Sequence, residues 1–206
     1  MSALSTLTAQ LGALGFRRAG HNLVVPLSDG YAGWLGLNKA TRGLPKGMCE
    51  LNPMIGVSDR RVEATLASSN IPRAGTGKQA TIVQPLYRIA GVPYGEWILD
   101  DADPEGSVKP VMIAMVEAGL PFMKRMSDPK AMIDALMSQR GGLGDAEIRL
   151  PLLLAGLGRV DQAHQAIDDA LARLGHDEGS LALRQIVQWE RDYLDRNASR
   201  TDSMGV

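Results

Sequence analysis

Residues 16–38, FRRAGHNLVVPLSDGYAGWLGLN, decide the fold class. The apolar and β-branched side chains of Phe16–Leu27 predict a strand, and Ser28-Asp29-Gly30 supplies an Asp-Gly turn. Tyr31–Asn38 predicts the returning strand, in which Gly33 indicates a bulge or the close approach of other backbone. The chain therefore begins an antiparallel sheet within its first forty or so residues.

The rest of the first half adds to this hairpin. Apolar stretches at Met48–Val57, Thr81–Ile89 and Glu96–Leu99 predict three further strands. Pro53 predicts an edge or a break in the first of them, because proline has no N–H to donate to a neighbouring strand. Ser58 predicts the N-cap of a helix that follows this strand.

Helices are predicted at the N-terminus and throughout the second half. Leucines spaced by three and four residues before Gly15 predict an amphipathic first helix. The first later helix is predicted to begin at Pro104 or Ser107 and to end at Gly119 and Pro121. A second is predicted to follow the cap Ser127-Asp128-Pro129. Three more are predicted over Asp145–Gly156, Arg159–Leu174 and Ser180–Asp195. The last ten residues are predicted to fray.

Together these elements predict an α+β fold. We expect an antiparallel-rich sheet of about five strands in residues 1–100 and four to five helices in residues 101–206, the two regions sharing one core. The net charge also changes sign between these two regions. Ten Lys and Arg against six Asp and Glu give +4 in residues 1–100, and twelve against seventeen give −5 in the remainder.

Composition excludes several classes of protein. With 45% hydrophobic and 22% charged residues, the chain is neither collagenous nor disordered. The net charge of −1 argues against a nucleic-acid partner, and the absence of any apolar run near 20 residues argues against a membrane span. Cys49 is the only cysteine and predicts a buried, inert thiol. The N-terminal leucines lack a basic flank, so we expect a cytoplasmic protein without a signal peptide.

Local catalytic motifs are incomplete. Gly75-Thr76-Gly77-Lys78 has neither the first glycine nor the hydroxyl of a P-loop, so a basic loop is favoured. The serine of Gly56-Val57-Ser58 lacks the closing glycine of a nucleophile elbow. The three histidines have no partner at a metal-binding spacing, so no metal or cofactor is expected. His164 shares a helical face with Asp161 and Asp168, which favours a solvated surface over a proton-transfer site.

Acidic residues gather late in the chain, and they form the candidate partner-binding set. Its members are Asp161, Asp168, Asp169, Asp177 and Glu178. They predict either the charged outer face of the helix over Arg159–Leu174 or a negative patch that meets a basic partner. No catalytic residue is predicted, and an enzyme whose site is assembled from residues far apart in sequence stays open as an alternative.

The segment from Leu152 to Leu171 resembles a tetratricopeptide helix pair. Small residues such as Ala163 and Ala166 would let two helices pack closely. No second copy follows at a 34-residue period, so the segment predicts one helical hairpin rather than a repeat array. A general helical-hairpin scaffold is therefore a further alternative.

One more resemblance bears on function. Tyr31–Asn38, Asn52–Val57 and Leu120-Pro121-Phe122-Met123 resemble segments of small bacterial α+β proteins, some of which are immunity proteins of contact-dependent growth inhibition systems. The resemblance implies a non-catalytic protein that neutralises a cognate toxin domain by stoichiometric occlusion. It transfers no functional residue, and the near-neutral charge departs from the acidic character common among inhibitors of nuclease toxins.

Overall fold

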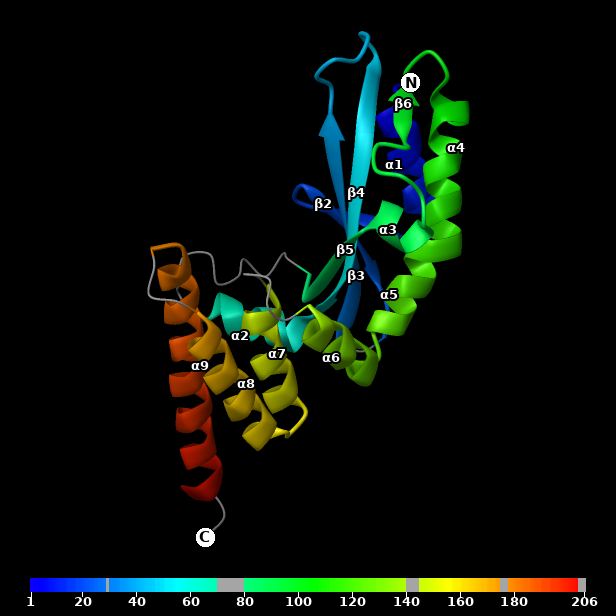
Figure 1. Ribbon diagram of the computed structural model, residues 1–206. Helices are drawn as coiled ribbons and strands as arrows, with labels where there is room; N and C mark the ends of the chain where they lie inside the picture. The colour runs from blue at the N-terminus through cyan, green and yellow to red at the C-terminus, as the bar shows by residue number, and fades with distance from the viewer. Residues whose placement is uncertain (29, 70–79, 140–144, 175–177, 204–206) are drawn as a thin grey trace. The chain divides into compact units, whose positions relative to one another are not determined.

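The computed structural model describes residues 1–28, 30–69, 80–139, 145–174 and 178–203, and it confirms the α+β class (Figure 1). A six-stranded sheet has the order β1-β2-β3-β4-β5, with β6 also paired to β4. The pairs β1–β2, β2–β3 and β4–β6 are antiparallel. The strands are β1 (Arg17–Ala19), β2 (Asn22–Pro26), β3 (Tyr31–Ala40), β4 (Met48–Asp59), β5 (Ile82–Pro85) and β6 (Ile98–Asp100).

The predicted first strand is two strands. Gly20 has a φ of +67° and forms a turn that pairs Ala19 with Asn22, so Phe16–Leu27 folds back on itself as β1 and β2. The following turn is present, since the Tyr31 N–H donates to the Ser28 carbonyl over 2.9 Å. Asp29 of that turn lies outside the described residues.

Three expectations near β4 and β5 are wrong in detail. β4 lies between β3 and β5 rather than at an edge, and Pro53 follows the residues Met48–Glu50 that pair with β6. The next helix is capped by Asp59, whose carboxylate accepts from the Arg61 and Val62 N–H groups, and not by Ser58. The predicted strand Thr81–Ile89 turns at Pro85 into a short helix.

Helices flank the sheet and fill the second half of the chain. They are α1 (Ala3–Ala13), α2 (Arg60–Ala67), α3 (Leu86–Ala90), α4 (Pro104–Ala114), the π-helical turn η1 (Met115–Gly119), α5 (Leu120–Met126), α6 (Pro129–Ser138), α7 (Asp145–Gly156), α8 (Val160–Arg173) and α9 (Glu178–Ser203). α1 ends as predicted at Gly15, where the Phe16 N–H donates to the Leu11 carbonyl over 3.1 Å.

The described part of the second half therefore holds six α-helices, not four to five. The helix expected to end at Gly119 and Pro121 continues through η1 into α5, where proline stands in the first turn. A wider π turn tolerates a missing N–H, and proline suits a first helical turn. Helix α9 also runs to Ser203, beyond the predicted fraying point.

The chain forms two compact units that interleave along the sequence. The sheet unit comprises Met1–Ser58 and Val83–Asp128, and the helical unit comprises Asp59–Ile82 and Pro129–Val206. The boundary expected at residue 100 thus falls inside the sheet unit.

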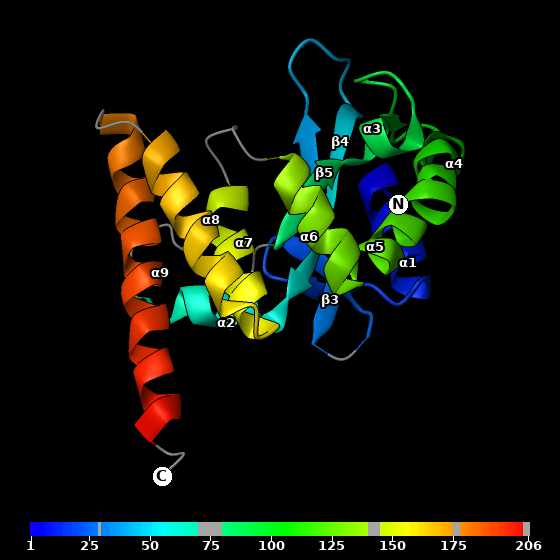
Figure 2. The same ribbon diagram turned by 60° about the horizontal axis from the view of Figure 1, so that its bottom comes forward.

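In the sheet unit, α1 and α4 pack side by side (Figures 1 and 2). Leu7 and Leu11 of α1 and Val108 and Val111 of α4 are buried. Gly33 marks a close approach, although by side chains rather than backbone: a Cβ there would lie 2.7 Å from the Met123 sulfur and from Val25. The helical unit is built from α2 and α6–α9, and Figure 2 shows α7, α8 and α9 side by side.

Candidate interaction site in the helical unit

The helical hairpin predicted from Leu152 onward is present as α7 and α8. Gly158 has a φ of +75° and ends α7, with its N–H donating to the Ala155 carbonyl and the Arg159 N–H donating to the Leu154 carbonyl. This pair of bonds is a Schellman motif, which satisfies carbonyls that the end of a helix leaves without partners. The motif reverses the direction of the chain, so α8 packs against α7.

Polar contacts join α8 to α9 along one seam. The Arg184 guanidinium donates to the Leu171 and Leu174 carbonyls at the end of α8, over 3.0 and 2.6 Å. Further along the seam, Arg191 pairs with Asp168. The two helices are antiparallel because residue numbers rise along α9 as they fall along α8 across these contacts.

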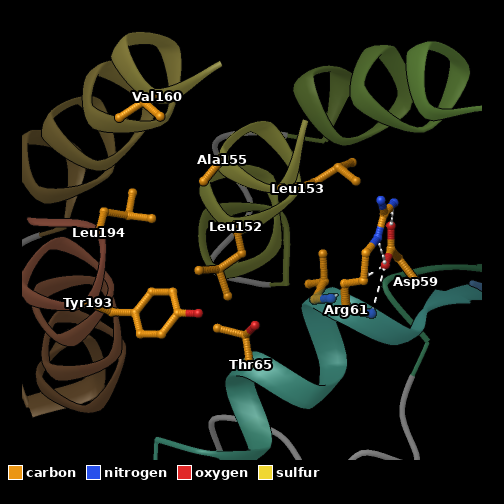
Figure 3. Close-up of a pocket in the computed structure, with 11 residues that line it drawn as sticks. Asp59, Arg61, Thr65, Leu152, Leu153, Ala155, Val160, Tyr193 and Leu194 are labelled. Carbon is orange, nitrogen blue, oxygen red and sulfur yellow. Dashed lines mark hydrogen bonds and ion pairs between the residues drawn. The ribbon is translucent and has the colours of Figure 1, made fainter. Parts of the chain in front are cut away.

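A pocket of about 340 Å³ opens in the helical unit, and Figure 3 shows its walls. Four helices supply it, and aliphatic side chains predominate. The lining residues are Asp59, Arg61, Val62, Thr65, Leu152, Leu153, Ala155, Gly156, Val160, Tyr193 and Leu194. The pocket is apolar for most of its surface, which is typical of sites that receive an apolar side chain or ligand.

Two hydroxyls give the pocket a polar element. In Figure 3 the Tyr193 hydroxyl points from α9 toward Leu152, and Thr65 of α2 lies beside it. Among the described residues neither hydroxyl has a hydrogen-bond partner. The Tyr193 ring is held by Trp189, which stacks on it with ring centroids 5.4 Å apart. A preoriented aromatic ring with a free hydroxyl suits recognition, because little conformational entropy is lost on binding.

One end of the pocket is charged. Asp59 is fully buried and receives the Arg61 guanidinium, whose Nη2 lies 2.7 Å from Oδ2. The Arg61 side chain is 54% exposed, so its charge faces water while the carboxylate that orients it does not. A carboxylate shared between a helix N-cap and a guanidinium holds the first turn of α2 in place.

Behind this wall lies a buried polar network. The Arg149 Nε donates to Glu63 over 2.9 Å, and both side chains are at most 2% exposed. The Thr81 hydroxyl donates to Glu63 over 3.0 Å and accepts from the Asp59 N–H over 2.8 Å. The network joins α2 and α7 with the chain entering β5. Since Glu63 and Arg149 do not line the pocket, we assign them a structural role.

Glu190 is a further buried acid of this unit. It is fully buried, and neither carboxyl oxygen has a hydrogen-bond partner. Burial raises the pKa of Glu190 well above its usual value, and nearby Arg149 opposes this shift to a smaller extent. Burial thus favours the protonated form of Glu190 in the helical core, and Glu190 too lies outside the pocket lining.

The structure separates the predicted partner-binding acids. Asp161 is exposed and has no partner among the described residues, whereas Asp168 pairs with Arg191 and Asp169 accepts from the Gln165 amide over 2.8 Å. Asp177 lies outside the described residues. Glu178 begins α9, but its side chain lies outside the described part of the structure. Two of the five acids thus serve contacts within the helical unit.

The lining residues include the carboxylate of Asp59. Asp161 directly follows the lining residue Val160 in sequence but does not itself line the pocket. Sequence analysis missed the pocket itself, including Thr65 and Tyr193. No local signal could have found them, because Thr65 of α2 lies more than 80 residues before the lining residues of α7 and Tyr193 lies more than 30 residues after those of α8.

The two histidines that the structure describes, His21 and His164, do not form a proton-transfer site in a cleft, and His176 lies outside the described residues. His164 is 32% exposed and its Nε2 lies 3.7 Å from the exposed carboxylate of Asp195, and His21 is also exposed. The described residues contain no group of three His, Cys, Asp or Glu side chains placed to hold a metal ion. Cys49 is half-buried, and burial raises the pKa of its thiol. The Gly75–Lys78 motif lies outside the described residues.

Helices in the described ranges are too short or too polar to cross a bilayer. No protein-family model, curated protein or solved structure matches the chain. A function for this chain therefore has to be inferred from its residues and their geometry alone.

Proposed function

We propose that the protein is a non-catalytic binding protein that neutralises a cognate toxin domain by stoichiometric occlusion in the bacterial cytoplasm. The pocket of the helical unit is the anchor point, and a complex of this kind buries roughly 1,200–2,000 Å² of combined surface. The carrying observation is an apolar pocket lined by two hydroxyls that have no partner among the described residues, with the exposed acid Asp161 next in sequence to the lining residue Val160.

The chemistry of the pocket defines the partner surface that it fits. Leu152, Leu194 and Val160 suit an aliphatic or aromatic side chain, and the hydroxyls of Thr65 and Tyr193 suit a peptide group beside it. Basic residues flanking that side chain would meet the neighbouring carboxylates. Electrostatic complementarity of this kind chiefly raises the association rate and selects the partner.

Charge reversal at the pocket border tests the electrostatic part of the proposal. With a toxin domain taken from a neighbouring reading frame as the probe, Asp161→Lys should slow association several-fold at low salt, and the difference should shrink at high salt. Stopped-flow fluorescence measures the rate. Asp134→Lys is the matched control, because Asp134 is an exposed acid of α6 in the same unit and does not line the pocket.

A second variant tests the anchor itself. Val160 is 39% exposed, so Val160→Asp should leave the fold intact and accelerate dissociation by about tenfold or more. Unchanged rates for both variants would place the interface elsewhere. Absence of any complex, together with failure of the chain to protect cells that produce the toxin, would reject the function.

A further inference from the structure

The outer face of α4 and of the π-helical turn η1 that continues it, both in the sheet unit, carries an exposed apolar ridge. Ile113 is 46% exposed and Val116 is 48% exposed, although both are large aliphatic side chains. Ile113 lies at the end of α4 and Val116 lies in η1, and both side chains line the same groove. Helix α4 runs along the rim of its unit in both views (Figures 1 and 2).

Grooves lie on both sides of this ridge. One groove runs between α4 and α1, with Gln10 on its far wall, and the other runs between α4 and α3, with Trp97 on its floor. Ile113 and Glu117 line both grooves, so they form the crest between them. A crest with a groove on each side is the shape that a second helix needs for ridges-into-grooves packing.

Charged residues of alternating sign follow one another along the crest, four or eight residues apart. Lys109 stands four residues before Ile113 and Glu117 stands four residues after it, and Glu105 lies one turn before Lys109. All three charged side chains are exposed, and none has an ion-pair partner among the described residues. Since residues four apart face each other on a helix, the lack of an internal pair between Glu105 and Lys109 leaves both charges available.

We propose that two copies of the chain associate through this face, with their α4 helices antiparallel and Ile113 at the two-fold axis. In that arrangement Lys109 of each copy faces Glu117 of the other, because Lys109 lies in α4 four residues before the axis and Glu117 lies in η1 four residues after it. The two contacts are equivalent, as a two-fold interface requires. Parallel α4 helices would instead place Lys109 against Lys109 and Glu117 against Glu117.

The ridge supplies the apolar centre of the interface. Ile113 would meet its own copy at the axis, and Val116 would enter the groove of the opposite chain beside Lys109. The charged pairs would lie around this centre, where they decide the orientation more than the affinity. This surface belongs to the sheet unit, so the proposal is independent of the pocket in the helical unit.

Sedimentation velocity of the full chain over a concentration series tests the proposal. The wild type should show twice the 22.1 kDa mass of one chain at high concentration, and Ile113→Asp should remain monomeric with an unchanged circular dichroism spectrum. A wild type that stays monomeric at its highest soluble concentration, or a dimer that survives Ile113→Asp, overturns the proposal.

Charge reversal then tests the orientation. Lys109→Glu alone and Glu117→Lys alone each place like charges at both contacts, so each variant should dimerise about tenfold more weakly than the wild type. An equimolar mixture of the two single variants restores two opposite-charge contacts. The mixture should therefore form a heterodimer with near wild-type affinity, and high salt should abolish this preference. A mixture no tighter than the separate variants contradicts the antiparallel arrangement.

Discussion

Glu190 is a carboxyl group in the core of the helical unit, without a hydrogen bond to either oxygen. Burial of an ionised carboxylate in such a place is unfavourable, so burial raises the pKa of Glu190 and favours its protonated form. The nearby Arg149 lowers this pKa, but by less than burial raises it. The cost of the arrangement depends on pH.

Glu190→Gln should stabilise the protein most at alkaline pH. As pH rises above the ordinary glutamate pKa, the unfolded chain loses the Glu190 proton while the folded chain keeps it, so wild-type stability falls. The loss is at most about 1.4 kcal/mol per pH unit, and it stops once pH exceeds the folded pKa. Glutamine has no proton to lose, so the gain from Glu190→Gln should grow between pH 5 and neutrality.

Urea denaturation at several pH values measures this effect. Asp134→Asn is the control, because Asp134 is exposed in the same unit and its substitution should leave the slope of stability against pH unchanged. A constant difference between Glu190→Gln and wild type at every pH would show that Glu190 titrates normally in the folded protein.

At the scale of elements, the end of α7 sets the geometry of the pocket. Gly158 adopts a left-handed conformation there, and the reversal that follows brings Val160 of α8 beside Leu152 and Leu153 of α7. The seam from α8 to α9 then places Tyr193 and Leu194 on the opposite wall. Pocket shape therefore depends on one backbone conformation that most residues avoid.

Gly158→Ala should destabilise the protein by about 1–2 kcal/mol, because a Cβ is strained at a φ of +75° whatever space surrounds it. Gly156→Ala, two residues earlier, is the matched control. Its Cβ would meet nothing within 4 Å and its φ is not positive, so alanine should be neutral or stabilising by up to about 1 kcal/mol. Equal losses for both variants in chemical denaturation would contradict the role of the turn.

At the scale of the whole molecule, the two compact units are interleaved. The chain leaves the sheet unit at Ser58, returns at Val83 and leaves again after Asp128. The sheet unit therefore needs α4 from the second half, and the helical unit needs α2 from the first half. Glu63 of α2 is also the ion-pair partner of the buried Arg149.

Fragments 1–100 and 101–206 should each fail to unfold cooperatively. The first fragment lacks α4, against which α1 packs, and the second retains Arg149 without Glu63. Loss of one partner from a buried ion pair costs about 3–5 kcal/mol, which is a large share of the stability of a small domain. Differential scanning calorimetry of the two fragments and of the full chain measures whether each unfolds cooperatively. A sharp transition in 101–206 alone would contradict the prediction.

The sequence alone determined the fold class and most helix positions. Strand hairpins and amphipathic helices leave periodic patterns, and Gly15 and Ser28-Asp29-Gly30 ended or reversed elements through local backbone preferences. Predictions from the sequence were wrong where adjacent residues favour different structures. Proline in β4 did not force an edge. Gly119 and Pro121 did not end the helix, because Gly119 closes the π turn η1 and Pro121 stands in the first turn of α5.

Only the tertiary structure decided which segments share a unit and which side chains form the pocket. Thr65, Leu152 and Tyr193 come from three separate helices, and the acids Asp168 and Asp169 turned out to contact residues within the helical unit. Such pairings depend on which helices pack together over long stretches of chain. Packing of this kind follows from the burial of many side chains at once and leaves no signature at a single position.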